Sequence, residues 1–209
     1  MEGGRTSRHT RMAIRKIALT GGIATGKSYV ANRLRAAGVP IVDADVLARE
    51  VVALGTPGLA AVRQRFGPDV VRRDGTMDRI RVGQIVFKDK RARQDLEAII
   101  HPAVQRAIDK YFATLPKKTP FAVADIPLLF ETGREGQYAL VIVVACPKAM
   151  QLQRVMERNN WTKEHAARRL AAQWPIEKKI EKATFVIKTD GTFDETNAQV
   201  DALIASFTK

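Results

Sequence analysis

The feature of this sequence that most limits its possible folds is the glycine-rich octapeptide 21–28, GGIATGKS. It matches the spacing G-x-x-x-x-G-K-[ST], in which glycines let successive backbone N–H groups converge on a phosphate. A short apolar run, 17–19, precedes the octapeptide, and a helical pattern begins at Lys27. This motif requires a strand before it and a helix after it, and the helix N-terminus adds partial positive charge. The sequence therefore predicts a P-loop protein that binds a nucleoside triphosphate.

The residue types in the loop define a candidate site for ATP with a Mg²⁺ cofactor. Lys27 can reach the β- and γ-phosphates, and the Ser28 hydroxyl is a suitable ligand for Mg²⁺. The glycines and the helix N-terminus supply backbone donors. The residues of this region that we expect to bind ATP are Gly22, Ala24, Thr25, Gly26, Lys27, Ser28 and Tyr29.

Short apolar runs alternate with helical stretches along most of the chain, which is typical of a parallel sheet with crossover helices. A closing helix is expected to carry Phe193, Val200 and Phe207 on one apolar face. We therefore predict an α/β fold, a three-layer α/β/α P-loop NTPase with a five-stranded parallel sheet. The expected strands lie at residues 17–19, 41–42, 121–124, 140–145 and 185–187.

Two segments interrupt this alternation and predict additions to the core. Residues 46–116 carry only helical signals and form a helical substrate-domain insertion, in which Pro102 should kink or restart the last helix. Residues 148–182 are helical and basic, and we expect a lid whose second helix begins near Thr162. The nucleotide-binding core is then residues 13–45, 117–147 and 183–209, after a disordered basic tail over residues 1–12.

Composition excludes several classes of protein. The single cysteine, Cys146, cannot form a disulfide framework and suits a reducing compartment. The longest apolar run, 138–146, has nine residues and cannot span a bilayer. No apolar segment follows the basic N-terminus, so we expect no signal peptide. These features predict a cytoplasmic protein without a membrane partner.

The formal net charge of +13 predicts an anionic partner. Residues 147–182 hold nine basic and four acidic residues, which is the charge expected of a lid that closes over polyphosphate substrates. A nucleic-acid-binding ATPase is the alternative. Aromatic content is 6% and no basic strand is interleaved with aromatic residues, so we expect no nucleic-acid partner.

The remaining pattern favours a small-molecule kinase among P-loop proteins. The Asn-Lys-x-Asp motif of GTPases does not occur in the sequence. The helical insertion could bind an acceptor alcohol, and an arginine-bearing lid would exclude the water that hydrolyses ATP. On this reasoning alone the acceptor stays open, with nucleosides and sugars among the candidates.

Three aspartates follow strand ends, where ligands bind in doubly wound sheets. A carboxylate at Asp43 or Asp45 could orient the acceptor hydroxyl and take its proton, or it could cap the following helix. We expect catalytic work from at least one of the two. Asp125 could hold Mg²⁺ through water or contact the acceptor, unless it is only a turn residue before Pro127.

The predicted lid carries arginines, which can bind phosphate through two hydrogen bonds. Arg154 and Arg158 lie four residues apart and share a helix face, so we assign both to ATP. Arg169 and Gln173 follow on the next helix. A basic helix residue can equally be a solvated surface group, and that alternative applies to each arginine here.

The sequence resembles the dephospho-CoA kinase family over residues 14–207. The P-loop alone is shared by many families, whereas the other matching motifs are specific in this order and spacing. They are Val42-Asp43-Ala44-Asp45, His101-Pro102-x-Val104, Asp125-Ile126-Pro127-Leu128-Leu129-Phe130-Glu131 and Arg169-Leu170-Ala171-Ala172-Gln173.

The resemblance implies phosphorylation of the ribose 3′-hydroxyl of dephospho-CoA by ATP, the last step of coenzyme A biosynthesis. ATP and dephospho-CoA are then the partners, the insertion is a CoA-binding domain, and the oligomeric state stays open. The resemblance makes Asp45 the catalytic base, with Asp43 and Lys27 as further catalytic residues, and it places Arg154 at the ATP end. The implied substrate-binding residues are Asp45, His101, Asp125, Leu128, Arg169 and Gln173, with Ser28 and Asp125 on the metal.

Two departures from the family pattern affect the site. Ala24 replaces a usual glycine, which is tolerated if its φ angle stays negative. Thr184 and Thr189 stand where Asp and Asn are usual. The adenine contacts of the loop 184–191 therefore do not follow from the resemblance.

Overall fold

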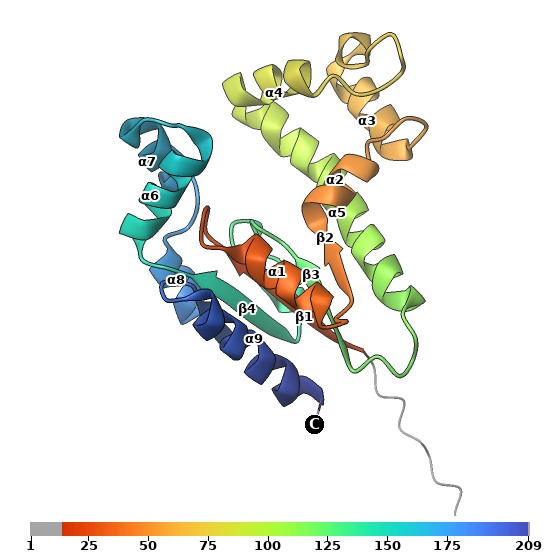
Figure 1. Cartoon of the computed structure of the whole chain (residues 1–209). Helices are drawn as coiled ribbons and strands as arrows, with labels where there is room; N and C mark the ends of the chain where they lie inside the picture. Colours follow the sequence, from red (N-terminus) through yellow and green to blue (C-terminus); the bar gives the residue numbers. More distant parts are fainter. Residues whose placement is uncertain (1–13, 209) are drawn as a thin grey trace, which may run out of the picture.

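Five parallel strands pair in one sheet in the order β2-β3-β1-β4-β5 (Figure 1). The structure is a computed structural model that describes residues 14–208, so the expected tail over residues 1–12 lies outside it. All five expected strands are present, which confirms the predicted α/β fold with a five-stranded parallel sheet. The strands are β1 (Arg15–Gly21), β2 (Ile41–Asp43), β3 (Phe121–Asp125), β4 (Leu140–Ala145) and β5 (Phe185–Lys188).

Helices cover both faces of the sheet because side chains alternate between the faces along each strand. Ile17 and Leu19 of β1 pack with α1 (Lys27–Ala36) and α9 (Phe193–Thr208) on one face. Ala18, between them, packs on the other face with α5 (Lys90–Thr114). β3 and β4 have continuous apolar sequences because both of their faces are covered. The predicted three layers follow from this alternation.

The insertion after β2 has an apolar core of its own. Val62, Val70 and Val82 are buried in it, each at most 2% exposed. The sequence predicts only helices in this segment. The structure differs in one detail, because Val71 and Met77 form an isolated antiparallel bridge. Its elements are α2 (Ala44–Glu50), α3 (Pro57–Phe66), the 3₁₀ helix η1 (Pro68–Val70), α4 (Arg79–Lys88) and α5.

The helix α5 continues through Pro102 as one element of 25 residues, so of the two expected effects of this proline, a kink or a restart, the restart does not occur. A proline within a helix removes one backbone hydrogen bond. Packing outweighs this loss, because Val104 and Ile108 pack on the sheet while Ile99 packs on the core of the insertion. The same helix therefore joins the insertion to the sheet.

The predicted lid segment, 148–182, begins with two paired helices, α6 (Lys148–Asn159) and α7 (Lys163–Ala171), which share a small core. Val155, Ala166 and Leu170 are buried between them. Figure 1 shows the lid and the insertion rising from the same end of the sheet. This is the carboxyl end of the parallel strands, since the insertion follows β2 and the lid follows β4.

The second lid helix begins where the sequence predicts. Thr162 caps α7 by accepting a hydrogen bond from the His165 backbone N–H at 3.3 Å. The chain then passes through α8 (Ile176–Glu181) to β5, and a further 3₁₀ helix, η2 (Glu135–Gln137), precedes β4. Among the helices within residues 14–208, none has both the length and the apolar content needed to cross a membrane.

The interior strand β4 supplies a test of the sheet core. Ile142 is 1% exposed, so Ile142→Ala should lower the free energy of unfolding by about 2–5 kcal/mol in urea denaturation. Phe87 on α4 is 91% exposed, and Phe87→Ala should change stability by about 0.5 kcal/mol or less. Equal losses in the two variants would contradict the assignment of Ile142 to the core.

Candidate active site

The octapeptide forms a tight loop between β1 and α1. Thr25 is fully buried, and its hydroxyl donates to the Gly22 carbonyl oxygen at 2.9 Å. A side chain at Gly21 would lie 2.7 Å from both Thr25 Oγ1 and the Val144 carbonyl oxygen, so only glycine fits there. Gly26 has φ of 81°, a left-handed conformation that glycine adopts at little cost. The sequence thus closes the loop into the shape that the motif predicts.

Ala24 differs from the expectation for this loop. Its φ is 57°, in the left-handed region, so the condition of a negative angle, under which alanine is tolerated without strain, is not met. This conformation costs a residue with a Cβ about 1–2 kcal/mol. The alanine is retained in it by the hydrogen bonds of neighbouring Thr25 and by packing on the lid core around Val155.

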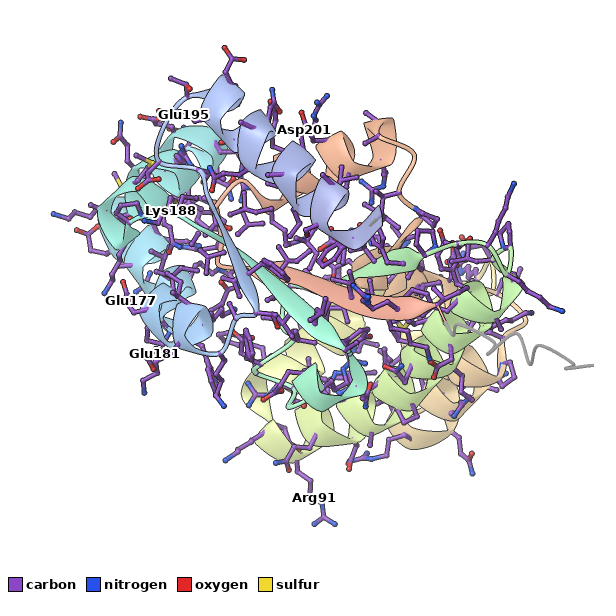
Figure 2. All side chains as sticks on the ribbon, turned by 90° about the horizontal axis from the view of Figure 1, so that it is seen from below. Arg91, Glu177, Glu181, Lys188, Glu195 and Asp201 are labelled. Atoms are coloured by element: carbon purple, nitrogen blue, oxygen red, sulfur yellow. The ribbon has the colours of Figure 1, made fainter. Side chains whose placement is uncertain are left out.

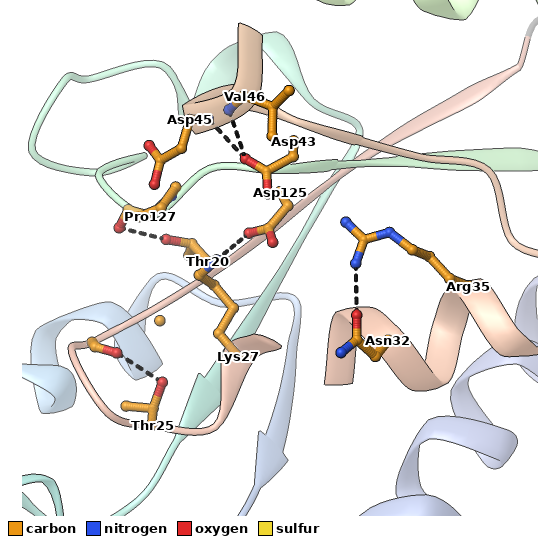
Figure 3. A network of polar contacts seen from close by, with 12 residues as sticks. Thr20, Thr25, Lys27, Asn32, Arg35, Asp43, Asp45, Val46, Asp125 and Pro127 are labelled. Atoms are coloured by element: carbon orange, nitrogen blue, oxygen red, sulfur yellow. Dashed lines mark hydrogen bonds and ion pairs between the residues drawn. The ribbon is translucent and has the colours of Figure 1, made fainter. Parts of the chain in front are cut away.

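Aspartates from two adjacent strands meet at the edge of the sheet beside the loop (Figure 3). Asp43 of β2 and Asp125 of β3 are direct partners in the parallel register. Asp43 caps α2, because its Oδ1 accepts from the backbone N–H groups of Asp45 at 2.8 Å and Val46 at 3.2 Å. Asp45 is left exposed in the first turn of α2 and lines the cavity next to the loop.

An ion pair joins the loop to β3. The Lys27 ammonium donates to Asp125 Oδ1 (Figure 3), and Asp125 is only 3% exposed. Burial raises the pKa of Asp125 above its ordinary value, and the nearby charge of Asp43 adds to this, while Lys27 lowers it. The buried carboxylate is therefore only partly compensated by one lysine, and a further cation at this edge would be stabilised.

A cavity of about 470 Å³ lies over the loop. Residues from the lid reach it as well as residues from the core: Gln173 Oε1 accepts the Ile23 backbone N–H at 2.8 Å. Pro127, which was not among the predicted site residues, also lines this cavity. The predicted residues that line it are Gly22, Ala24, Thr25, Gly26, Lys27, Ser28, Asp45, Arg154, Arg158 and Gln173.

A second cavity, of about 570 Å³, adjoins the first through Ala24, Gly26 and Arg154. The Arg154 guanidinium donates to the Thr189 carbonyl oxygen at 2.8 Å and so joins the lid to the end of β5. The ring of Tyr29, a predicted ATP residue, lies 4.8 Å from the ring of Phe193 on this cavity's wall.

Sequence reasoning missed Phe193 as a site residue. Helical spacing predicted it on the apolar face of the closing helix, but it is 70% exposed. It is the first residue of α9, and a first-turn side chain can lie beyond the surface that the later turns cover. The signal that could have identified it is its position directly after the divergent loop 184–191.

Four predicted substrate residues, Asp125, His101, Arg169 and Leu128, do not line either of these two cavities. His101 is partly buried, and burial, followed by the charge of Arg134, lowers its pKa. The Arg169 guanidinium lies over the ring of Trp161, 5.6 Å from its centroid. Leu128 is 45% exposed. The roles of His101, Arg169 and Leu128 with substrate stay predictions.

Comparison with known proteins gives one consistent result. Residues 15–195 match the family model described as dephospho-CoA kinase. A dephospho-CoA kinase from Enterococcus faecalis is 43% identical over 184 residues, covering 88% of this chain and 92% of the relative. One from Thermosynechococcus vestitus is 48% identical, covering 89% and 91%. The solved structure of a Campylobacter jejuni dephospho-CoA kinase aligns with a TM-score of 0.71 at 29% identity, covering 91% of this chain and 96% of that one.

The raised pKa of Asp125 predicts a pH-dependent effect on stability. The folded protein holds this proton more tightly than the unfolded chain, in which the group titrates near 3.8. The free energy of unfolding therefore falls as pH rises above that value. The asparagine of the variant Asp125→Asn cannot titrate, so the variant does not show this loss. The melting temperature of the variant minus that of wild type should therefore increase from pH 4 to pH 7, by about 2–4 °C for each kcal/mol that the wild type loses. Thermal melts in which this difference stays constant or decreases with pH would contradict the raised pKa of Asp125.

Proposed function

The chain belongs to the dephospho-CoA kinase family, and we propose that its P-loop cavity is where ATP phosphorylates dephospho-CoA. The enzyme transfers the γ-phosphoryl group of ATP to the ribose 3′-hydroxyl, giving coenzyme A and ADP, in coenzyme A biosynthesis. The observation that carries the proposal is that the loop 21–28 and the Asp45 carboxylate line the same cavity. A phosphate donor site and a proton acceptor are thus adjacent.

The loop and Lys27 bind and stabilise the transferring group in this proposal. Backbone N–H groups of the loop surround the phosphates at the N-terminus of α1. The Lys27 ammonium contacts Asp125 and also lines the cavity, so its charge is close to the phosphates that enter. Charge stabilisation by a fixed group of this kind acts in the transition state.

Asp45 is the proposed base for the acceptor hydroxyl. It is exposed to the cavity and its backbone N–H is held by Asp43. The carboxylate would orient the 3′-hydroxyl and accept its proton as the bond to phosphorus forms. Asp43 supports this role because its cap fixes the start of α2, on which Asp45 lies.

A kinase that uses ATP requires a divalent metal ion, and we propose Mg²⁺ here. The residues present fit it, because Ser28 offers a hydroxyl oxygen in the cavity and Asp125 a buried, under-compensated carboxylate. Mg²⁺ prefers oxygen ligands and is bound through one or two carboxylates together with substrate phosphates. Bound there, it would neutralise charge on the phosphate oxygens.

The lid and the insertion have complementary roles in the proposal. Arg154 and Arg158 of α6 reach the cavity and would bind the phosphates of ATP while the lid excludes water. The segment 46–116, which includes His101, would bind the CoA end of the acceptor. Leu128 and Arg169, which lie outside this segment, would contact the acceptor when the lid closes. Gln173 is already hydrogen-bonded to the loop and would lie between the two substrates.

The function is tested by coupled ADP release with dephospho-CoA against a panel of nucleosides and sugars. We expect dephospho-CoA to be the only acceptor of the panel that is phosphorylated, and its product to carry the new phosphate on the ribose 3′-hydroxyl. Lys27→Ala should lower kcat by about 10²–10³-fold, since it removes a charge that stabilises the transition state. Turnover with another alcohol but not with dephospho-CoA would overturn the acceptor, and near-normal activity of Lys27→Ala would overturn the P-loop assignment.

The role of Asp45 has a separate test. Asp45→Asn should lower kcat by about 10²–10⁴-fold, because the amide cannot accept the proton, with little change in ATP affinity. Glu50→Gln is the matched control, since Glu50 is an exposed carboxylate on the same helix. The steady-state kcat of the two variants is the measurement that tests whether Asp45 is the base. Equal activity of Asp45→Asn and Glu50→Gln would assign the base to Asp43 or Asp125.

A further inference from the structure

Lys179 is a fully buried lysine that the reaction described above does not use. It lies on α8, and none of its surface is exposed. Its ammonium nitrogen is 2.8 Å from Glu131 Oε1 and 3.1 Å from the Gly21 carbonyl oxygen. Moving an ammonium group out of water is costly unless its partners compensate the charge. The two acceptors are therefore the groups that Lys179 holds together.

Among the charged residues of α8, only Lys179 is buried. Glu177 and Glu181 of the same helix are exposed, and Figure 2 shows both at the edge of the molecule. Lys178, the neighbouring lysine, is exposed as well. The helix thus turns one ammonium group inward, to the point where β1 ends and the P-loop begins.

The hydrogen bond to Gly21 acts on the phosphate loop itself. A trans peptide group is planar, and its C=O and N–H point in opposite directions. By holding the Gly21 carbonyl, Lys179 therefore also fixes the direction of the Gly22 N–H. Gly22 lines the phosphate cavity, whereas Lys179 does not. The lysine thus acts on the loop without being available to substrate.

Glu131 extends the contact to the base of the lid. The same oxygen that pairs with Lys179, Oε1, accepts the Trp174 backbone N–H at 2.9 Å. The Trp174 ring lies parallel to the ring of Phe130, with centroids 5.9 Å apart. One carboxylate therefore fixes both ends of the segment 174–179, which joins the lid to α8.

The same segment holds the loop at a second point. Gln173, directly before it, accepts the Ile23 backbone N–H at 2.8 Å. The loop is therefore anchored on both sides of Gly22, at the carbonyl before it by Lys179 and at the N–H after it by Gln173.

We propose that Lys179, neutralised by Glu131, is a positioning residue that sets the first peptide groups of the P-loop and ties them to the base of the lid. This inference rests on the proposed function, in which that loop holds the phosphates of ATP. It does not depend on the identity of the acceptor.

The test replaces the ion pair by neutral groups of similar shape, Lys179→Met with Glu131→Gln. Replacing a buried ion pair in this way is often neutral for stability, so the melting temperature should stay within about 5 °C of wild type. Loss of the anchor should lower kcat about 10²-fold, since misplacement by about 1 Å has that effect. The KM for dephospho-CoA should change less than about threefold, because the loop does not bind the acceptor.

Two single variants serve as controls. Lys178→Met removes a lysine from the same helix at an exposed position and should leave kcat and melting temperature at wild-type values. Glu131→Gln alone leaves the buried ammonium without its counter-charge, so the melting temperature should fall, but Lys179 can still donate to Gly21 and the kcat of the folded enzyme should fall less than about threefold. A loss in Glu131→Gln equal to that of the double variant would assign the effect to Glu131 and overturn the role of Lys179.

ADP binding measured by calorimetry separates this inference from the proposed function. If the wild type binds ADP but does not convert dephospho-CoA, the proposed function fails, while ADP affinity still tests the loop. In that assay the double variant should bind ADP about tenfold more weakly. Wild-type kcat and ADP affinity in a folded double variant would overturn the inference. If that double variant does not fold, Lys179→Gln with Glu131→Gln replaces it. The glutamine side chain at position 179 is shorter than lysine and cannot reach both acceptors, so the same losses of kcat and ADP affinity are expected. Wild-type values in this second double variant would also overturn the inference.

Discussion

The site depends on the parallel pairing of β2, β3 and β1, because parallel strands end at the same edge of a sheet. Asp43 and Asp125 are partners in register, and β1 runs directly into the loop beside them. Charged groups cannot lie in the middle of a sheet that is covered on both faces, so they gather where the strands end. The same edge leads into the insertion after β2 and the lid after β4. Donor, acceptor and lid thus meet at one place because of the topology.

The electrostatics of that edge favour function over stability. Asp125 is nearly fully buried, and burial raises its pKa although Lys27 is in contact with it. A carboxylate in this state weakens the fold at neutral pH, and the proposed binding of a cation there would offset this cost. Ala24 is a second local cost, because a left-handed alanine is strained. Both costs fall on the phosphate loop or its direct neighbour.

Much of the architecture and part of the site could be predicted from the sequence. The five strands follow from apolar runs, and the loop, Asp45 and Arg154 follow from motifs and helical spacing. The positive φ of Ala24 could not be predicted, since it depends on how Thr25 folds the loop. Lys179 was missed for a different reason. Periodicity treats lysine as a surface residue, and its burial depends on Glu131, which lies 48 positions earlier in the chain.

In the proposed function the lid moves while the phosphate loop stays fixed, and the distribution of buried groups separates these two requirements. The helices α6 and α7 share a core of three buried residues, so little apolar contact opposes their displacement. At the base of the lid, however, Glu131 and Lys179 form a buried pair that also holds the loop. A small core beyond this buried ionic anchor favours movement of α6 and α7 over movement of the segment 173–179, which is hydrogen-bonded to the loop and to Glu131. The loop can then keep its geometry through opening and closure, which transfer to an alcohol instead of water requires.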